Sequence, residues 1–223
     1  MNPIFDWSFA LEIVPTLARA LVITIQATVL GMAIAVVLGL LLALARRARW
    51  PLLSYPAAFV IEFVRSTPLL VQMYFLFYVL PGSGVQFSPL VTGVLALGVH
   101  YAAYCAEVYR AGIEAVPRGQ IEAATALNLS SWRTATGIVL PQAIPPVVPA
   151  LGNYLVAMFK DTPLLSAITV VELLQQSKII GSATFRYTEP LTLVGALFLV
   201  LSLIAAWGVR RLERRLQRYG GRA

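Results

Sequence analysis

The sequence predicts an all-α membrane protein with about five transmembrane helices, and three observations lead to this fold class. Of the 223 residues, 59% are apolar and 12% are charged, and the mean hydropathy is +0.79. A soluble domain would carry about twice that fraction of charged residues. Apolar runs long enough to cross about 30 Å of hydrocarbon recur along the chain, separated by polar or basic segments. We therefore expect residues 1–223 to form a single transmembrane domain.

Residues 1–19 are expected to form an external lead-in to the first span. They lack a basic segment and carry Asp6 and Glu12, so they do not resemble a cleavable signal peptide. The aromatic residues of the lead-in fit either an interfacial helix or a disordered tip. The first span follows over residues 20–44. Small residues recur in it at every fourth position, which predicts a helix-packing face: Ala27, Gly31, Ala35, Gly39 and Ala43.

The second apolar run, residues 51–80, is interrupted by charges and by a Thr-Pro step. Glu62 and Arg65 lie three residues apart and so share a helix face. If the run is one span, this pair faces protein or water within the bundle, because exposure to lipid is costly. If residues 52–64 form an interfacial helix, the pair is exposed to water. Both alternatives are open. The third span, about residues 89–108, contains His100, which we read as a packing residue, and no metal site is predicted.

Residues 117–141 form a polar insert between apolar runs, so they cannot lie in hydrocarbon. The pattern predicts two short helices that meet at a sharp turn, the second running from Ser131 toward Pro141. Asn128 stands where the first helix would end, and Asn tolerates the left-handed backbone of such a turn. Ser130 can cap the second helix. An ordinary amphipathic loop is the simpler interpretation of the same residues.

The fourth span begins with four prolines, Pro141, Pro145, Pro146 and Pro149, and ends near residue 159. Freed backbone groups in a membrane are tolerated only where protein or water satisfies them, so this span is expected to line a path. Its end, KDTPLL at 160–165, resembles RSTPLL at 65–70, and paired interruptions of this kind point to a substrate pathway, although chance could also produce them. The substrate-path candidates are Arg65, Thr67, Pro68, Asn153, Lys160, Asp161 and Thr162.

After this span, residues 164–175 are predicted to form a short re-entrant or gate helix, residues 191–207 the last span, and residues 208–223 a basic cytoplasmic tail. Basic residues fix the orientation. With the N-terminus outside, the inner segments hold twelve arginines; the outer segments hold four basic residues, Arg19, Lys160, Lys178 and Arg186; and Arg65 is unassigned, which accounts for all 17. The insert and the tail are therefore expected in the cytoplasm, and the net charge of +7 reflects topology rather than nucleic-acid binding.

The insert resembles the EAA loop of ABC importer permeases. The resemblance rests on Glu122-Ala123-Ala124, a turn residue four places later, Ile138, and Leu140-Pro141. It implies a type I importer permease core in which this loop is a coupling helix that docks into an ATPase subunit. The implied docking residues are Gly119, Glu122, Ala123, Ala124, Asn128, Leu140 and Pro141. The family usually has Gly where this chain has Asn128.

The flanking text, AEVYRAGIEAVPRGQ before the loop and LPQA, LGNYL and KDTPLLSAI after it, resembles the polar amino acid subfamily, most closely permeases for ectoine and hydroxyectoine. This resemblance implies ABC ATPase subunits, a second permease subunit in a homodimer or heterodimer, and an external solute-binding protein. The chain has no phosphate-binding loop of its own. We therefore expect no cofactor and no enzymatic activity here, ATP being bound by the partner, and a multi-pass location in the cell membrane.

Two other classes are open on the sequence. A self-contained channel or proton-coupled carrier would use His100, Glu62 and Glu107 as a relay, but it leaves the ordered insert without a purpose. A pure scaffold subunit would give no account of the proline-rich fourth span.

Overall fold

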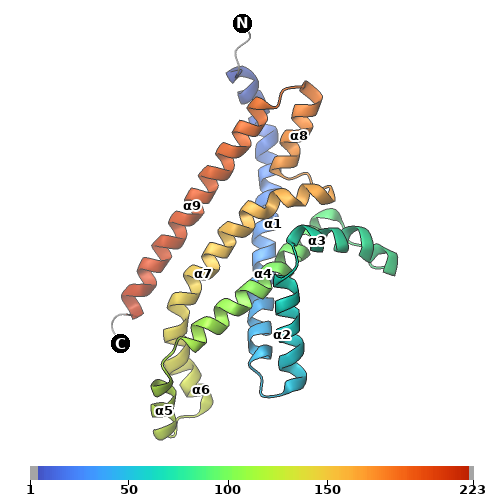
Figure 1. Ribbon diagram of the computed structural model, residues 1–223. Helices are drawn as coiled ribbons and strands as arrows, with labels where there is room; N and C mark the ends of the chain where they lie inside the picture. The colour runs from blue at the N-terminus through green and yellow to red at the C-terminus, as the bar shows by residue number, and fades with distance from the viewer. Residues whose placement is uncertain (1–4, 221–223) are drawn as a thin grey trace.

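The computed structural model describes residues 5–220, with side chains through Leu216. Over this part the chain consists of helices joined by short turns and extended segments, without strands, which confirms the predicted fold class (Figure 1). Within these described residues, four helices are long and apolar enough to cross a membrane, and a bent pair makes a fifth candidate. The elements are α1 Trp7–Arg46, α2 Pro51–Arg65, α3 Leu69–Tyr74, η1 Phe75–Val79, η2 Leu80–Ser83, α4 Pro89–Glu114, α5 Arg118–Ala126, α6 Ser131–Thr134, η3 Ala135–Val139, α7 Leu140–Asp161, η4 Thr162–Ile168, α8 Leu173–Thr184 and α9 Thr188–Gly220.

The predicted packing face of the first span is confirmed, because all five of its small residues are buried. α1 packs along α4, and this is the most extensive helix pair of the fold. A Cβ atom built on Gly39 would lie 2.8 Å from the Ala102 carbonyl oxygen and 2.6 Å from the Cys105 Cβ. The missing side chain therefore sets how closely the two helices approach.

The lead-in is helical rather than a disordered tip over its described part, and residues 1–4 lie outside the described residues. α1 begins at Trp7, well before the predicted start of the span. Asp6 caps the helix by accepting hydrogen bonds from the backbone N–H groups of Ser8 and Phe9. Pro15 interrupts the hydrogen-bond ladder without ending the helix.

The second apolar run is not a single straight span. It breaks at residues 66–68 into α2 and a second helical segment, Leu69–Ser83, and the two are bent by 104°. Gln72 stabilises the break, because its Nε2 donates to the Val64 carbonyl oxygen at 2.8 Å and to the Thr67 hydroxyl at 2.7 Å. The segment beginning with α3 extends sideways from the bundle (Figure 1). The sequence thus predicted the interruption at residues 66–68, but not that the following segment turns sideways from the bundle.

Two predicted boundaries around the fourth span are wrong. The second helix of the polar insert is not separate, because residues Ser131–Ile168 form one helical rod that passes through η3 into α7. The expected short helix over residues 164–175 is instead η4, an extended segment and the start of α8. Thr169 adopts φ 65°, which ends η4, and the Glu172 carboxylate caps α8 by accepting from the N–H groups of Leu174 and Gln175.

Candidate functional site

The turn inside the polar insert has the predicted left-handed backbone. Asn128 has φ 54°, its N–H donates to the Thr125 carbonyl, and the Leu129 N–H donates to the Ala124 carbonyl, each at 3.0 Å. These two bonds satisfy the last carbonyls of α5 and define a Schellman turn. The Ser130 hydroxyl then accepts from the Arg133 N–H and caps α6. The insert is therefore an ordered helix–turn–helix corner, with Asn128 at the position where glycine is the usual residue.

The exposed face of this corner differs in part from the predicted one. Ala124 is only 1% exposed, because α5 packs against η3, so of the two alanines among the implied docking residues only Ala123 is exposed. Glu122 and Gly119 are exposed. Two large apolar side chains are exposed as well, Leu127 at 73% and Trp132 at 76%. The sequence analysis did not select these two, although a Trp and a Leu on a short polar insert are the kind of residue that anchors a partner.

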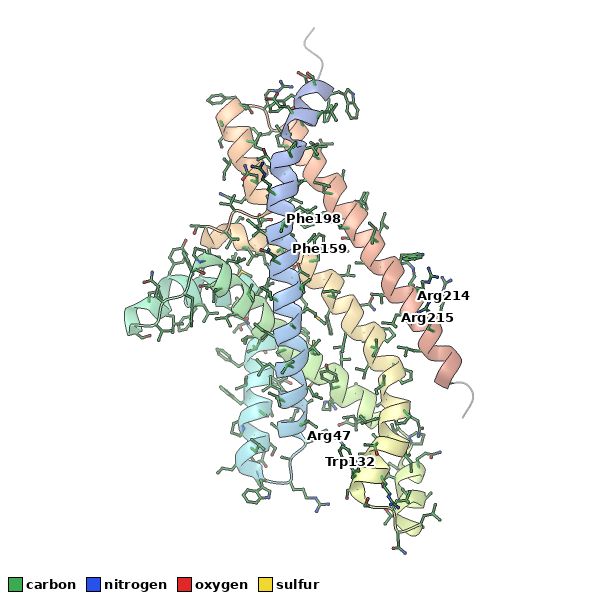
Figure 2. All side chains as sticks on the ribbon, turned by 180° about the vertical axis from the view of Figure 1, so that it is seen from behind. Arg47, Trp132, Phe159, Phe198, Arg214 and Arg215 are labelled. Carbon is green, nitrogen blue, oxygen red and sulfur yellow. The ribbon has the colours of Figure 1, made fainter. Side chains whose placement is uncertain are left out.

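The last two predicted docking residues, Leu140 and Pro141, begin α7. Both are exposed, Leu140 at 42%. They follow η3 rather than lying on α5, so the structure places them on the helical rod that leaves the corner. The corner occupies the extreme end of the molecule that also holds the α1–α2 turn (Figure 1), and Arg47 and Trp132 mark these two features in Figure 2.

A network of ion pairs ties α1, α2 and α4 together near this end. Arg46 contacts Glu107 and lies 4.0 Å from Glu62, and Glu62 also lies 3.6 Å from Arg65. Glu107 accepts further hydrogen bonds from Arg110. The Glu62–Arg65 pair predicted from the sequence is thus real and belongs to a larger group. Glu62 is 58% exposed, so the pair is not enclosed within this chain.

The three relay residues of the carrier alternative are engaged elsewhere. His100 Nδ1 lies 3.1 Å from the Gln72 side-chain oxygen, which places it at the α2–α3 break. Glu62 and Glu107 belong to the arginine network just described. His100 acts as the packing and hydrogen-bonding residue that the sequence indicated, so the structure does not favour a proton relay through these groups.

The two Thr-Pro interruptions meet in space. α3 contacts η4, and Leu69 and Leu165, which follow the two interruptions, belong to one buried cluster. Tyr101, Tyr104 and Tyr154 lie between the interruptions, with ring centroids 5.6 to 6.2 Å apart. This group of three rings is called the tyrosine cluster below.

A charge of each sign flanks the tyrosine cluster. The Arg65 guanidinium lies 5.5 Å from the centroid of the Tyr104 ring. On the other flank, the Tyr101 hydroxyl donates to an Asp161 carboxylate oxygen at 2.7 Å. A cation and an anion therefore flank three packed aromatic rings formed by α4 and α7 at the end of α2, of which Tyr101 is buried and Tyr104 and Tyr154 are half-buried. The sequence indicates both charges and, on the fourth span, Tyr154 as path residues, but it gives no signal for Tyr101 and Tyr104.

The other path candidates are not part of this group. The hydroxyls of Thr67 and Thr162 donate to backbone carbonyls of the helix that precedes each, α2 and α7, and Pro68 occupies the N-cap position of α3. Asn153 and Lys160 lie seven residues apart and so share a face of α7, next to the face of Tyr154 and Asp161. Lys160 lines an apolar groove of about 450 Å³ between α7 and α9, where Phe159 packs against Phe198 (Figure 2).

A family model and similar proteins of known sequence indicate the same family for this chain. Residues 35–218 match the model of the binding-protein-dependent transport system inner membrane component. The chain is 50% identical over 217 residues to the probable amino-acid ABC transporter permease protein y4tG of Sinorhizobium fredii, covering 96% of this chain and 93% of that protein. It is 34% identical to the glutamine transport system permease protein GlnP of Escherichia coli, covering 96% and 98% of the two chains.

Solved structures agree with this result. A crystal structure of an amino acid ABC transporter with histidines superposes with a TM-score of 0.90 at 34% identity, covering 95% of this chain and 99% of that one. The MetNI methionine ABC transporter shares the fold, with a TM-score of 0.72 at 21% identity and coverage of 92% and 98%. The chain therefore belongs to the family of binding-protein-dependent transport system inner membrane components, which are transport subunits rather than enzymes.

Proposed function

We propose that this chain is the permease subunit of an ATP-driven importer for an amino acid or a related zwitterion. The observation that carries the proposal is the tyrosine cluster with Arg65 on one flank and Asp161 on the other. A zwitterion has a carboxylate that suits the arginine and a cation that suits the carboxylate and the aromatic faces. The relatives named for amino-acid and glutamine transport support the same substrate class.

Ectoine is the specific substrate that we propose within this class. Its positive charge is delocalised over the planar N–C–N amidinium unit of its ring, and cations of this kind bind to aromatic faces. The tyrosine cluster supports this choice without distinguishing ectoine from other zwitterions. In the complete importer, a solute-binding protein would deliver the substrate outside, and a second permease subunit would complete the path. The exposed aromatic side chains of Tyr74, Phe75 and Tyr78 on the sideways segment support such a neighbour.

The polar corner is the proposed docking site for the ATPase. Glu122 would fix the register, and Leu127 and Trp132 would supply buried apolar contact. This assignment places the corner, the α1–α2 turn and the end of α9 in the cytoplasm and the N-terminus outside. ATP would be bound by the partner alone, and its hydrolysis would drive alternating access through the rod that starts at Ser131.

Uptake by the reconstituted importer tests the substrate and the mechanism together. The chain, its ATPase, its sister permease and its binding protein are placed in vesicles and supplied with labelled ectoine, with arginine and glutamine as competitors. We expect uptake that disappears when the ATPase is disabled. Uptake of an amino acid instead would keep the mechanism and discard ectoine, and uptake independent of the ATPase would overturn the proposal in favour of a carrier.

Two variants separate the two sites, and the exposed Glu12 supplies a matched control for each. Asp161→Asn should reduce uptake by about ten-fold or more, since a hydrogen bond to a charged group contributes about 1.5–3 kcal/mol, while the ATPase still copurifies. Glu122→Lys should instead reduce copurification of the ATPase. Glu12→Gln and Glu12→Lys should have neither effect. If Asp161→Asn transports normally, the proposed path is wrong.

A further inference from the structure

Along one face of the cytoplasmic half of α9, exposed side chains form a stripe that changes from apolar to cationic. Val200, Leu203, Ile204 and Trp207 follow at spacings of three and four residues and are each 52 to 58% exposed. The same face continues through exposed arginines at the next helical positions, Arg210, Arg211 and Arg214. The stripe thus passes from aliphatic to aromatic to cationic along one line of the helix.

Most of this face points away from the rest of the chain, and only Leu203 also borders the groove between α7 and α9. Val209, on the opposite face of α9, packs onto Gly152 of α7, where a Cβ atom would lie 2.7 Å from a Val209 methyl group. In contrast, Figure 2 shows Arg214 and Arg215 at the free lower end of α9, apart from the other helices. The stripe therefore faces the surroundings of the subunit rather than its core.

The cationic part of the stripe forms a shallow hollow with one aromatic wall. Trp207, Arg210, Arg211 and Arg214 line a space of about 200 Å³, and among the described side chains no carboxylate lines it. The Arg211 guanidinium lies 5.0 Å from the Trp207 ring centroid, which holds the cation beside the ring. Arginine binds phosphate through two parallel hydrogen bonds, and tryptophan prefers the level of lipid headgroups.

We propose that this hollow binds the phosphate headgroup of an anionic phospholipid, with the acyl chains lying along Val200, Leu203 and Ile204. Charge complementarity and the continuous apolar stripe below the arginines select this occupant: a free phosphate would use only the cationic end. The proposal requires that α9 crosses a bilayer, and it is independent of the substrate that the importer carries.

Fluorescence quenching of Trp207 tests the proposal directly. The chain has four tryptophans, so replacing Trp7, Trp50 and Trp132 by Phe leaves Trp207 as the only reporter in the full chain. The protein is placed in lipid nanodiscs in which brominated phosphatidylglycerol or brominated phosphatidylcholine is titrated. We expect half-maximal quenching at a clearly lower fraction of the anionic lipid. One arginine near an anionic surface is worth about a five-fold change in binding, so Arg211→Gln with Arg214→Gln should weaken the preference by about 25-fold.

A control pair of substitutions removes two positive charges from positions outside the hollow. Arg49→Gln with Arg215→Gln takes away two exposed arginines that do not line the hollow, and it should leave the preference intact. Three outcomes would overturn the proposal: equal quenching by the two lipids, a preference that survives loss of Arg211 and Arg214, or no quenching by either lipid, which would show that protein covers the face. Displacement of the anionic lipid by millimolar inorganic phosphate would assign the hollow to a soluble anion instead.

Discussion

Replacing Gly39 by alanine should separate α1 from α4 and destabilise the permease. The added Cβ atom would lie 2.6 Å from the Cβ of Cys105, 2.8 Å from the Ala102 carbonyl oxygen and 3.2 Å from the Ala106 backbone nitrogen. Two of these neighbours are backbone atoms and the third is bonded directly to backbone, so no side-chain rotation can relieve the clash.

The size of the effect follows from these distances. Nonbonded carbon atoms pack at about 3.5–4.0 Å, so the helices must move apart by about 1 Å. Overpacking of this kind costs about 1–3 kcal/mol. For a chain of this size, that corresponds to a fall of about 2–12 °C in the melting temperature. Gly31→Ala should have a smaller effect, because its nearest neighbours are the Met158 sulfur at 3.1 Å and the Leu97 Cβ at 3.2 Å.

The assay is thermal unfolding of the purified chain in detergent, with Gly195→Ala and Gly208→Ala as matched controls. No atom lies within 4 Å of a Cβ at either control position, and alanine favours a helix more than glycine does. The controls should therefore melt at or slightly above the parent temperature. If Gly39→Ala melts together with Gly195→Ala, the close approach of α1 and α4 is not what fixes the fold.

Substitutions at three further positions have defined expectations. Asn128→Gly should be tolerated, whereas Asn128→Val should destabilise the corner by about 1–2 kcal/mol, because a β-branched residue resists positive φ. Limited proteolysis of residues 117–141 would detect the loosened corner. Equal resistance of the two variants to the protease would contradict the role of the left-handed turn. Gln72→Met should cost about 1–3 kcal/mol in thermal unfolding, since it removes the shortest hydrogen bond to the Val64 carbonyl and the side-chain oxygen that His100 Nδ1 contacts. Gln120→Met, at an exposed site, is its control. The Ser8 hydroxyl and backbone N–H groups lower the pKa of Asp6 from 3.8 to about 2. The stabilisation that the ionised Asp6 gives to the folded chain should therefore be complete above about pH 4 and disappear as the pH falls toward 2. The difference in melting temperature between the parent and Asp6→Asn should vanish over that interval, and a constant difference would refute Asp6 as an ionised helix cap.

Much of the fold could be predicted because the bilayer imposes strong and local rules. Apolar length identified the spans, the fourfold spacing of small residues identified the α1 face against α4, and the pattern of residues 117–141 indicated a helical corner, with an ordinary amphipathic loop as the alternative. The left-handed turn at Asn128 was predictable because few residues other than glycine adopt that conformation. The predicted basic tail also includes Arg218, whose side chain is not described, and Arg222, which lies outside the described residues.

The remaining features depend on contacts between distant parts of the chain. The 104° bend after α2 is stabilised by Gln72, and nothing in the local pattern distinguishes a bend from a kinked span. The tyrosine cluster combines residues of α4 and α7 that are about fifty positions apart. Likewise, the burial of Ala124 follows from how α5 packs against η3 rather than from its spacing. Contacts of this kind require the tertiary arrangement.

The helical rod from Ser131 to Asp161 gives the proposed importer a mechanical lever. It joins the polar corner directly to the tyrosine cluster, and thirty residues of helix span about 45 Å. A tilt of about 5° at one end of such a rod displaces the other end by about 4 Å, which approaches one helical turn. A small rotation of a docked ATPase would therefore suffice to widen or close the region around Asp161, and the mechanical gain would be set by where along the proline-rich part of α7 the rod pivots.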